Sequence, residues 1–433
     1  MILIQENFLH YIWKQQFFAI NKLQTTNSES LQIYNVGGHN LNSGPDFFNA
    51  KLEIGSQLWA GNVEIHVKSS DWYLHQHEID KNYDNVILHV VWIHDTEIYR
   101  KNNVVIPTLE LKQFVSIKAI SQYQKLFSKK EKWINCENYI GSVDKFILNN
   151  WLEVLYFERL EQKSKLIIKL LKHSANDWET VLFQLLSMNF GLKVNGAAFL
   201  NLAESFDYKI IRKERDVLLK LEALLFGQAG FLDEEKEAGY YIKLQKEYHY
   251  LQLKYQLSPL YNGQFQFFRL RPNNFPTIRL AQFAMLNYKH QNLFSKILEA
   301  KYLDDYYQIF GVKTSSYWET HYSFNSMSVK RSKTITKPFI NLLLINTIIP
   351  LKFMYYKHIG KLNDEFIIEL VQQISFEKNS VINKFESLLN KNLKGEQKIN
   401  NALESQAFLQ LKIAYCNNQN CLQCAIGNSY LKG

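Results

Sequence analysis

The chain has 433 residues, of which 46% are hydrophobic, 14% aromatic and 21% charged. This apolar content suffices for large cores and excludes a disordered chain, while 17 Gly and 7 Pro exclude a collagen-like architecture. Four cysteines exclude a disulfide-stabilised secreted scaffold. The net charge of +9 favours an anionic partner such as DNA or RNA, although a general bias toward Lys, Asn and Ile explains much of it.

The first 130 residues predict one helix followed by short strands. Apolar side chains recur at helical spacing in the first 15 residues, and from residue 30 they alternate with polar ones. Gly, Ser and Pro residues separate the expected strands. A polar stretch between the third and fourth strands predicts a loop and a short helix. The expected strands are residues 31–36, 47–54, 58–68, 86–92 and 105–111, and the polar stretch is 69–85.

The rest of the chain predicts mostly helix. Long apolar periodicities run from residue 146 to about residue 415, and the basic segment 328–337 between them predicts a loop. We find no internal repeat. We therefore expect an α/β domain at residues 1–130, followed by a large, mostly α-helical region at residues 131–433 that ends in a cysteine cluster.

No segment predicts secretion or a membrane span. The N-terminal residues include Gln, Glu and His where a signal peptide needs an apolar stretch. The longest apolar stretch, residues 339–351, is interrupted by Asn341, Asn346 and Thr347 and closed by Pro350. It is shorter than the roughly 20 residues that a span requires. We expect a cytoplasmic protein without membrane contact.

Candidate catalytic residues lie on two neighbouring strands of the first domain. Side chains alternate along a strand, so Glu64, His66 and Lys68 share one face. Asp46 opens the preceding strand, and a hairpin turn would bring it beside Glu64. Two such carboxylates suit Mg²⁺ or Mn²⁺, which would activate a water for phosphodiester hydrolysis, and a nearby cation would stabilise the transition state. The alternative is a turn followed by a solvated strand face.

These residues resemble the PD-(D/E)xK nuclease superfamily. Pro45-Asp46 and Glu64-Ile65-His66 match its positions in order, and Glu6 matches an acidic residue that many members supply from the first helix. The resemblance implies a restriction-endonuclease-like mixed sheet flanked by helices, with Glu6, Asp46, Glu64, His66 and Lys68 as catalytic residues. His66 stands where the superfamily has lysine, which leaves the cationic role to Lys68 and puts catalysis in doubt.

A histidine-rich segment follows these strands. His75 and His77, with Asp80, offer imidazole and carboxylate ligands of the kind that bind Zn²⁺ or Mn²⁺. Alternatively, His75 and His77 contact the phosphates of a nucleic acid, or they are exposed in a polar loop.

The whole chain also resembles one uncharacterised bacterial family, domain of unknown function 2851. The resemblance implies a domain organisation and no chemistry, since the family has no established function. It rests on residues 44–47, 63–66 and 223–230, on Asp71-Trp72 with His75 and His77, on residues 271–276 with Arg279, and on the C-terminal cysteines.

The four cysteines predict a second metal site. Cys416, Cys421 and Cys424 fall within nine residues, and Cys136 is the remaining cysteine. Four thiolates complete a tetrahedral Zn²⁺ site or hold an iron–sulfur cluster. The alternative is four reduced, partly buried thiols.

Basic and aromatic side chains alternate in residues 267–279. Arg269, Arg271 and Arg279 lie close in sequence to Phe267, Phe268 and Phe275, a composition that suits a phosphate or a single strand of nucleic acid. The alternative is a structural loop whose arginines pair with carboxylates of neighbouring helices.

Two functions fit these observations. One is a metal-dependent nuclease or phosphodiesterase that acts on DNA or RNA. The other is a catalytically inactive nuclease-like scaffold that binds nucleic acid or a protein partner. Glu6, Asp46 and Glu64 favour the first function, and His66 at the lysine position favours the second.

Overall fold

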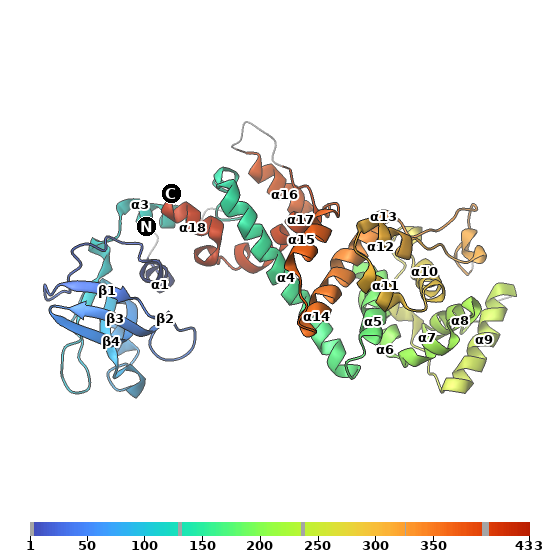
Figure 1. Cartoon of the computed structure of the whole chain (residues 1–433), viewed down its shortest axis with the longest axis horizontal. Coiled ribbons are helices and arrows are strands. Elements are labelled where there is room, and N and C mark those ends of the chain that lie inside the picture. The colour runs from blue at the N-terminus through green and yellow to red at the C-terminus, as the bar shows by residue number, and fades with distance from the viewer. Residues whose placement is uncertain (1–3, 129–131, 235–238, 325, 392–397) are drawn as a thin grey trace. The chain divides into compact units, whose positions relative to one another are not determined.

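The computed structural model describes residues 4–128, 132–234, 239–324, 326–391 and 398–433. The chain forms two compact units (Figure 1). Unit 1 comprises residues 1–151, 387–397 and 411–433, and unit 2 comprises residues 152–386 and 398–410. The expected boundary at residue 130 falls outside the described residues.

Unit 1 is built on a mixed sheet, as the alternating pattern of residues 30–111 predicts. The strand order is β1-β3-β4-β5-β6, with β2 paired to β3. β1, β3 and β4 are antiparallel, whereas β4, β5 and β6 are parallel. The strands are β1 (Leu31–Asn35), β2 (Gly38–His39), β3 (Phe47–Ile54), β4 (Gln57–Lys68), β5 (Val86–Ile93) and β6 (Thr108–Glu110).

The hydrophobic core of unit 1 gathers helices from both ends of the chain. Apolar side chains of α1 (Glu6–Gln15) and α3 (Ile117–Leu126) pack with Val63, Ile65, Leu88 and Val90 of the sheet. Cys421 and Leu431 lie in the same cluster. The C-terminal segment, with α18 (Ala425–Lys432), is therefore part of the unit that carries the sheet.

Unit 2 is almost entirely helical, in agreement with the apolar periodicity of the sequence. A short strand pair, β7 (His321–Ser323) and β8 (Ser326–Met327), is the exception among its described residues. The division between the units falls within α4 (Lys145–His173) and α16 (Ser380–Leu389). The other helices are α5 (Trp178–Phe190), α6 (Leu192–Glu204), α7 (Tyr208–Glu214), α8 (Leu218–Gln228), α9 (Gly239–Tyr255), α10 (Pro276–Lys289), α11 (Leu293–Glu299), α12 (Leu303–Phe310), α13 (Lys337–Leu343), α14 (Ile349–His358), α15 (Asp364–Gln372) and α17 (Ala402–Gln410).

The longest apolar stretch forms a longer helix than the sequence predicts. α13 and α14 are continuous through a π-helical turn, Leu344–Ile348, so the helix does not end at Pro350. Proline clashes with the carbonyl four residues before it, and the wider π turn relieves that clash. Among the described residues, Lys337–His358 is the helix long and apolar enough to cross a membrane, and 72% of its most apolar window is buried, as in the core helix of a globular protein.

Candidate metal centre

The register of β3 and β4 brings Asp46 and Glu64 together. Phe47 pairs with Val63, so the residues that flank this pair, Asp46 and Glu64, lie opposite each other. The Asp46 backbone N–H donates to Glu64 Oε2 at 3.1 Å, and the Ile65 N–H donates to Asp46 Oδ2 at 2.9 Å. Each carboxylate is thus held by the backbone of the other strand, as the hairpin prediction requires.

Two histidines flank the other oxygen of Glu64, and a third histidine contacts one of them. Glu64 Oε1 lies 3.5 Å from His66 Nε2 and 3.4 Å from His77 Nε2, and His66 Nε2 lies 3.1 Å from His75 Nδ1. The ligand atoms of the three histidines all lie within 4.8 Å of one another. Two ligands of one tetrahedral zinc ion are about 3.3 Å apart when the Zn–N distance is near 2.05 Å. The set therefore has the spacing of a metal centre.

His89 of β5 contacts the Nδ1 atom of His66 and so orients its ring. It pairs with Glu64 in the parallel register of β4 and β5, and its Nε2 lies 2.8 Å from His66 Nδ1. If His66 Nδ1 carries the proton and donates it to His89, then His66 Nε2 has a free lone pair directed at the other ligands. Histidines that bind metals almost always donate their second N–H in this way.

Burial favours the neutral form of His66, His77 and His89. Burial, and after it the neighbouring His77 and His75, lower the pKa of His66 to about 3. Burial also lowers the pKa of His77 and, together with His66, that of His89. Neutral imidazole is the form that binds a metal. Burial, and then the charge of Asp46, raise the pKa of Glu64 far above the ordinary carboxyl value. The ionised carboxylate is therefore unfavourable there, and a bound cation would offset that cost.

A second triad lies on the other side of Asp46. His10 Nε2 is 3.1 Å from Asp46 Oδ2 and 3.8 Å from Glu6 Oε1. Burial opposes a charge on His10, but Asp46 and Glu6 outweigh it and raise the pKa of the imidazole. Sequence reasoning found Glu6 and Asp46 but missed His10, although its spacing of four residues from Glu6 places both on one face of α1.

Two residues that the sequence analysis placed with this site have other surroundings. The Lys68 side chain is exposed, and among the described residues it has no ion pair or hydrogen bond with Asp46 or Glu64. Asp80 accepts a hydrogen bond from the Asn82 N–H at 2.9 Å and caps residues 81–83. His77 lies 3.4 Å from Glu64 Oε1, and His75 contacts His66.

The four cysteines all belong to unit 1. Burial, and then the three other thiols, raise the pKa of Cys136. Burial also raises the pKa of Cys416 to about 12 and that of Cys421 to about 11. Asn135 Nδ2 donates to the Cys421 sulfur at 3.4 Å. No three of the four sulfurs, all of which belong to described residues, lie within 4.8 Å of one another.

The predicted nucleic-acid arginines divide into two groups. Arg271 and Arg279 line one pocket of unit 2. The Arg269 guanidinium lies over the ring of Phe268, 5.1 Å from its centroid, and is not among the residues that line the pocket. Arg331 and Lys333, from the segment that the sequence analysis treated as a basic loop, line the same pocket.

A family described as "Protein of unknown function (DUF2851)" matches residues 6–380 of the chain. No curated protein and no solved structure matches the chain significantly. The family match covers the residues of both triads and of the pocket, and it ends before the three C-terminal cysteines.

Proposed function

The chain belongs to the DUF2851 family, which assigns no activity, and we propose from the site itself that unit 1 is a metal-dependent phosphodiesterase acting on DNA or RNA. The observation that carries this proposal is the convergence of His66, His75 and His77, with Glu64 beside two of them. The distances from Glu64 Oε1 to the two Nε2 atoms, 3.4 and 3.5 Å, exceed those of good hydrogen bonds and suit two ligands of one ion.

The donor set favours zinc or manganese over magnesium. Three imidazole nitrogens and one carboxylate oxygen are typical of Zn²⁺ sites, whereas Mg²⁺ prefers oxygen ligands. Such an ion acts as a Lewis acid and lowers the pKa of a bound water. His75 is exposed, so the site is open to solvent on that side.

Asp46 and His10 supply the polar groups next to this site. Asp46 accepts a hydrogen bond from the Ile65 N–H, which fixes its carboxylate. The same carboxylate lies 3.1 Å from His10 Nε2 and so holds the imidazole in place. His10, between two carboxylates, is the group positioned to exchange a proton with a substrate oxygen. The positive net charge of the chain and the superfamily resemblance of Pro45-Asp46 and Glu64 support a phosphodiester as the substrate.

Two substitutions test metal binding and chemistry separately. His75→Ala should lose the metal, measured by elemental analysis of the full chain, and with it the cleavage of labelled DNA and RNA. His10→Gln should retain the metal and lower the cleavage rate about 10²- to 10⁴-fold, the usual contribution of an acid–base group. His249→Ala, at an exposed residue of α9, is the control and should change neither.

The outcomes separate the two functions. Metal content and cleavage that survive His75→Ala would contradict the proposed site. A metal that His75→Ala removes, in a protein that cleaves neither DNA nor RNA, would contradict the enzymatic proposal and favour the inactive scaffold.

A further inference from the structure

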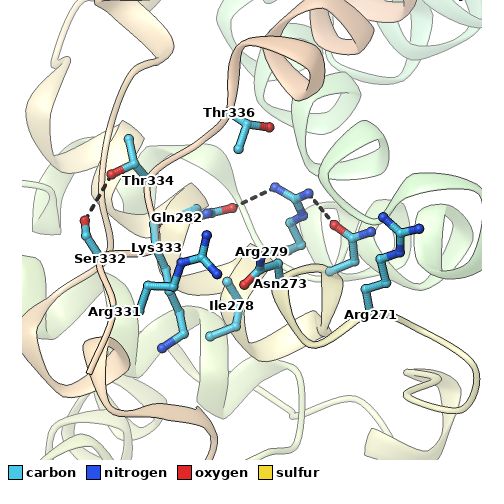
Figure 2. A pocket seen from close by; sticks show the side chains of 11 residues that line it. Arg271, Asn273, Ile278, Arg279, Gln282, Arg331, Ser332, Lys333, Thr334 and Thr336 are labelled. Atoms are coloured by element: carbon cyan, nitrogen blue, oxygen red, sulfur yellow. Dashed lines mark hydrogen bonds between the residues drawn. The ribbon is translucent and has the colours of Figure 1, made fainter. Parts of the chain in front are cut away.

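Unit 2 contains a pocket whose charged lining residues are all cations. The cavity, about 240 Å³, lies between the 3₁₀ turn Pro272–Asn274, the start of α10 and residues 331–336. Figure 2 shows Arg271 and Arg279 on one side and Arg331 and Lys333 on the other. No carboxylate is among the residues that line it.

Two of these cations are buried without a carboxylate partner. Arg279 is 7% exposed, and its guanidinium donates to the amide oxygens of Gln282 at 2.8 Å and Asn274 at 2.6 Å. Its Nε has no hydrogen-bond partner in the described part of the chain. Lys333 is 4% exposed and donates to the backbone carbonyls of Trp318 and Glu319. The charged groups of Arg279 and Lys333 also lie over the rings of Phe339 and Tyr322, 3.5 and 4.2 Å from the centroids. Neutral acceptors and ring faces offset a buried charge less than a bound anion would, and an incompletely paired buried charge is costly.

The other two cations and several hydroxyl groups form the rim. Arg271 and Arg331 are exposed, and within the described residues neither side chain has an ion pair or a hydrogen bond. Ser332 and Thr334 bond to each other at 3.1 Å and line the same cavity. Glu319, whose charge acts on Lys333, lies 3.8 Å from Lys330 and does not line the pocket. Guanidinium, ammonium and hydroxyl donors around one cavity are the partners of a phosphate group.

We propose that this pocket binds a phosphate group of a single-stranded nucleic acid. The cavity can hold a phosphate, and the attached nucleoside would remain outside it. Phe268, three residues before Arg271, is 77% exposed and offers a face on which a base can stack. The inference rests on the nucleic-acid substrate of the proposed function and is independent of the catalytic step.

A binding experiment tests the rim directly. The full chain is titrated with a short fluorescent thymidine oligonucleotide in EDTA over a series of salt concentrations, and anisotropy gives the affinity. The double variant Arg271→Gln/Arg331→Gln should bind at least about tenfold more weakly, and the slope of log K against log salt should fall by about 1. Both substitutions are at exposed side chains, so the fold should persist.

The control removes the same charge elsewhere on unit 2. Lys243→Gln/Lys361→Gln lowers the net charge equally at two exposed lysines outside the pocket and should leave the affinity near that of the parent chain. Equal losses in the two double variants would overturn the inference. Protein that binds inorganic phosphate in competition assays but no oligonucleotide would also overturn it. Because the assay contains EDTA, strand binding without any cleavage under metal-loaded conditions would count against the catalytic proposal alone.

Discussion

The resemblance to the PD-(D/E)xK superfamily would place a lysine at His66, and the burial of His66 decides what it can do there. Its side chain is 1% exposed, and its pKa of about 3 keeps it neutral at physiological pH. A neutral imidazole cannot replace the charge of a lysine, but it can bind a metal. His66 is therefore suited to the role of a metal ligand beside Glu64.

Substitution of His89 tests whether it orients His66. His89→Leu removes the acceptor of the His66 Nδ1–H and should weaken metal affinity about 10- to 100-fold, the usual effect of losing such a partner. His89→Gln keeps a polar atom near the position of Nε2 and should weaken it less. Competition with a chelator measures both affinities, and equal losses in the two variants would contradict the orienting role.

Glu222 of unit 2 should make stability depend on pH. It is 2% exposed, accepts hydrogen bonds from Ser315 at 2.7 Å and Tyr240 at 2.8 Å, and burial raises its pKa to about 7. The folded state binds the proton more tightly than the unfolded state. This contribution to the free energy of unfolding is therefore full below about pH 4.5 and declines as the pH rises to about 7, by on the order of 3 kcal/mol.

Glu222→Gln should remove that decline while keeping an acceptor in place. Urea unfolding at pH 5 and pH 8 gives the two free energies for the parent and variant chains. Glu369→Gln, at an exposed position of α15, should retain the pH dependence of the parent chain. Parallel profiles for the parent chain and Glu222→Gln would rule out Glu222 as the source.

The proximity of side chains in the histidine site could be predicted where they lie on one strand or on the two strands of one hairpin. Alternation along β4 places Glu64 and His66 on one face, and a hairpin places Asp46 opposite Glu64. His10 and the His66–His89 pair depend on how α1 and β5 pack, which spacing within one element does not determine. In the same way, Arg331 and Lys333 meet Arg271 and Arg279 across more than 50 positions of sequence, and no local pattern reports such a contact.

At the scale of elements, the contact between α8 and α9 depends on a missing side chain. Gly227, which the sequence places near the end of α8, packs directly against the ring of Tyr248 on α9. A Cβ atom at this position would overlap the ring. Gly227→Ala should therefore destabilise unit 2 by about 1–3 kcal/mol, the usual cost of overpacking, measured by thermal unfolding.

Gly239 provides the matched control. It lies at the start of α9, and a Cβ added there would meet no atom within 4 Å among the described residues beyond its chain neighbours. Gly239→Ala should leave the free energy of unfolding within about 1 kcal/mol of the parent value. Similar effects at both glycines would contradict the packing argument.

The C-terminal cysteine segment is the element in which a metal should contribute to folding. We propose, from their spacing in the sequence and their common place in unit 1, that Cys136, Cys416, Cys421 and Cys424 bind Zn²⁺ or an iron–sulfur cluster, which would draw their sulfurs together. Cys421→Ser/Cys424→Ser should release that metal and make the C-terminal segment sensitive to protease. Elemental analysis distinguishes zinc from iron, and acid-labile sulfide identifies a cluster.

The same double variant should leave the metal of the histidine site bound, since its ligands come from β4 and the segment after it. Protein that contains no second metal before the substitution would contradict the cysteine proposal. Protein that keeps it after the substitution would place the ligands elsewhere.

At the scale of the whole molecule, the two units follow different rules of sequence. The strands of unit 1 lie largely where the sequence pattern predicts them, although β4 and β5 are buried along runs of consecutive residues rather than in strict alternation. The helix through Pro350 does not follow the local rule that proline ends a helix, because burial of its apolar side chains and a π turn outweigh the cost. Packing overrides local propensity most readily in such a deeply buried element.

The assignment of residues 411–433 to unit 1 has a consequence for synthesis on the ribosome. The sheet and both triads are complete in sequence by Glu110, yet Cys421 and Leu431 of the core of unit 1 emerge only after all of unit 2 has been translated. The core of nascent unit 1 therefore stays incomplete, with apolar side chains accessible to chaperones, while more than 200 further residues are added. A nonsense mutation late in the gene would for this reason damage the first part of the protein to be made.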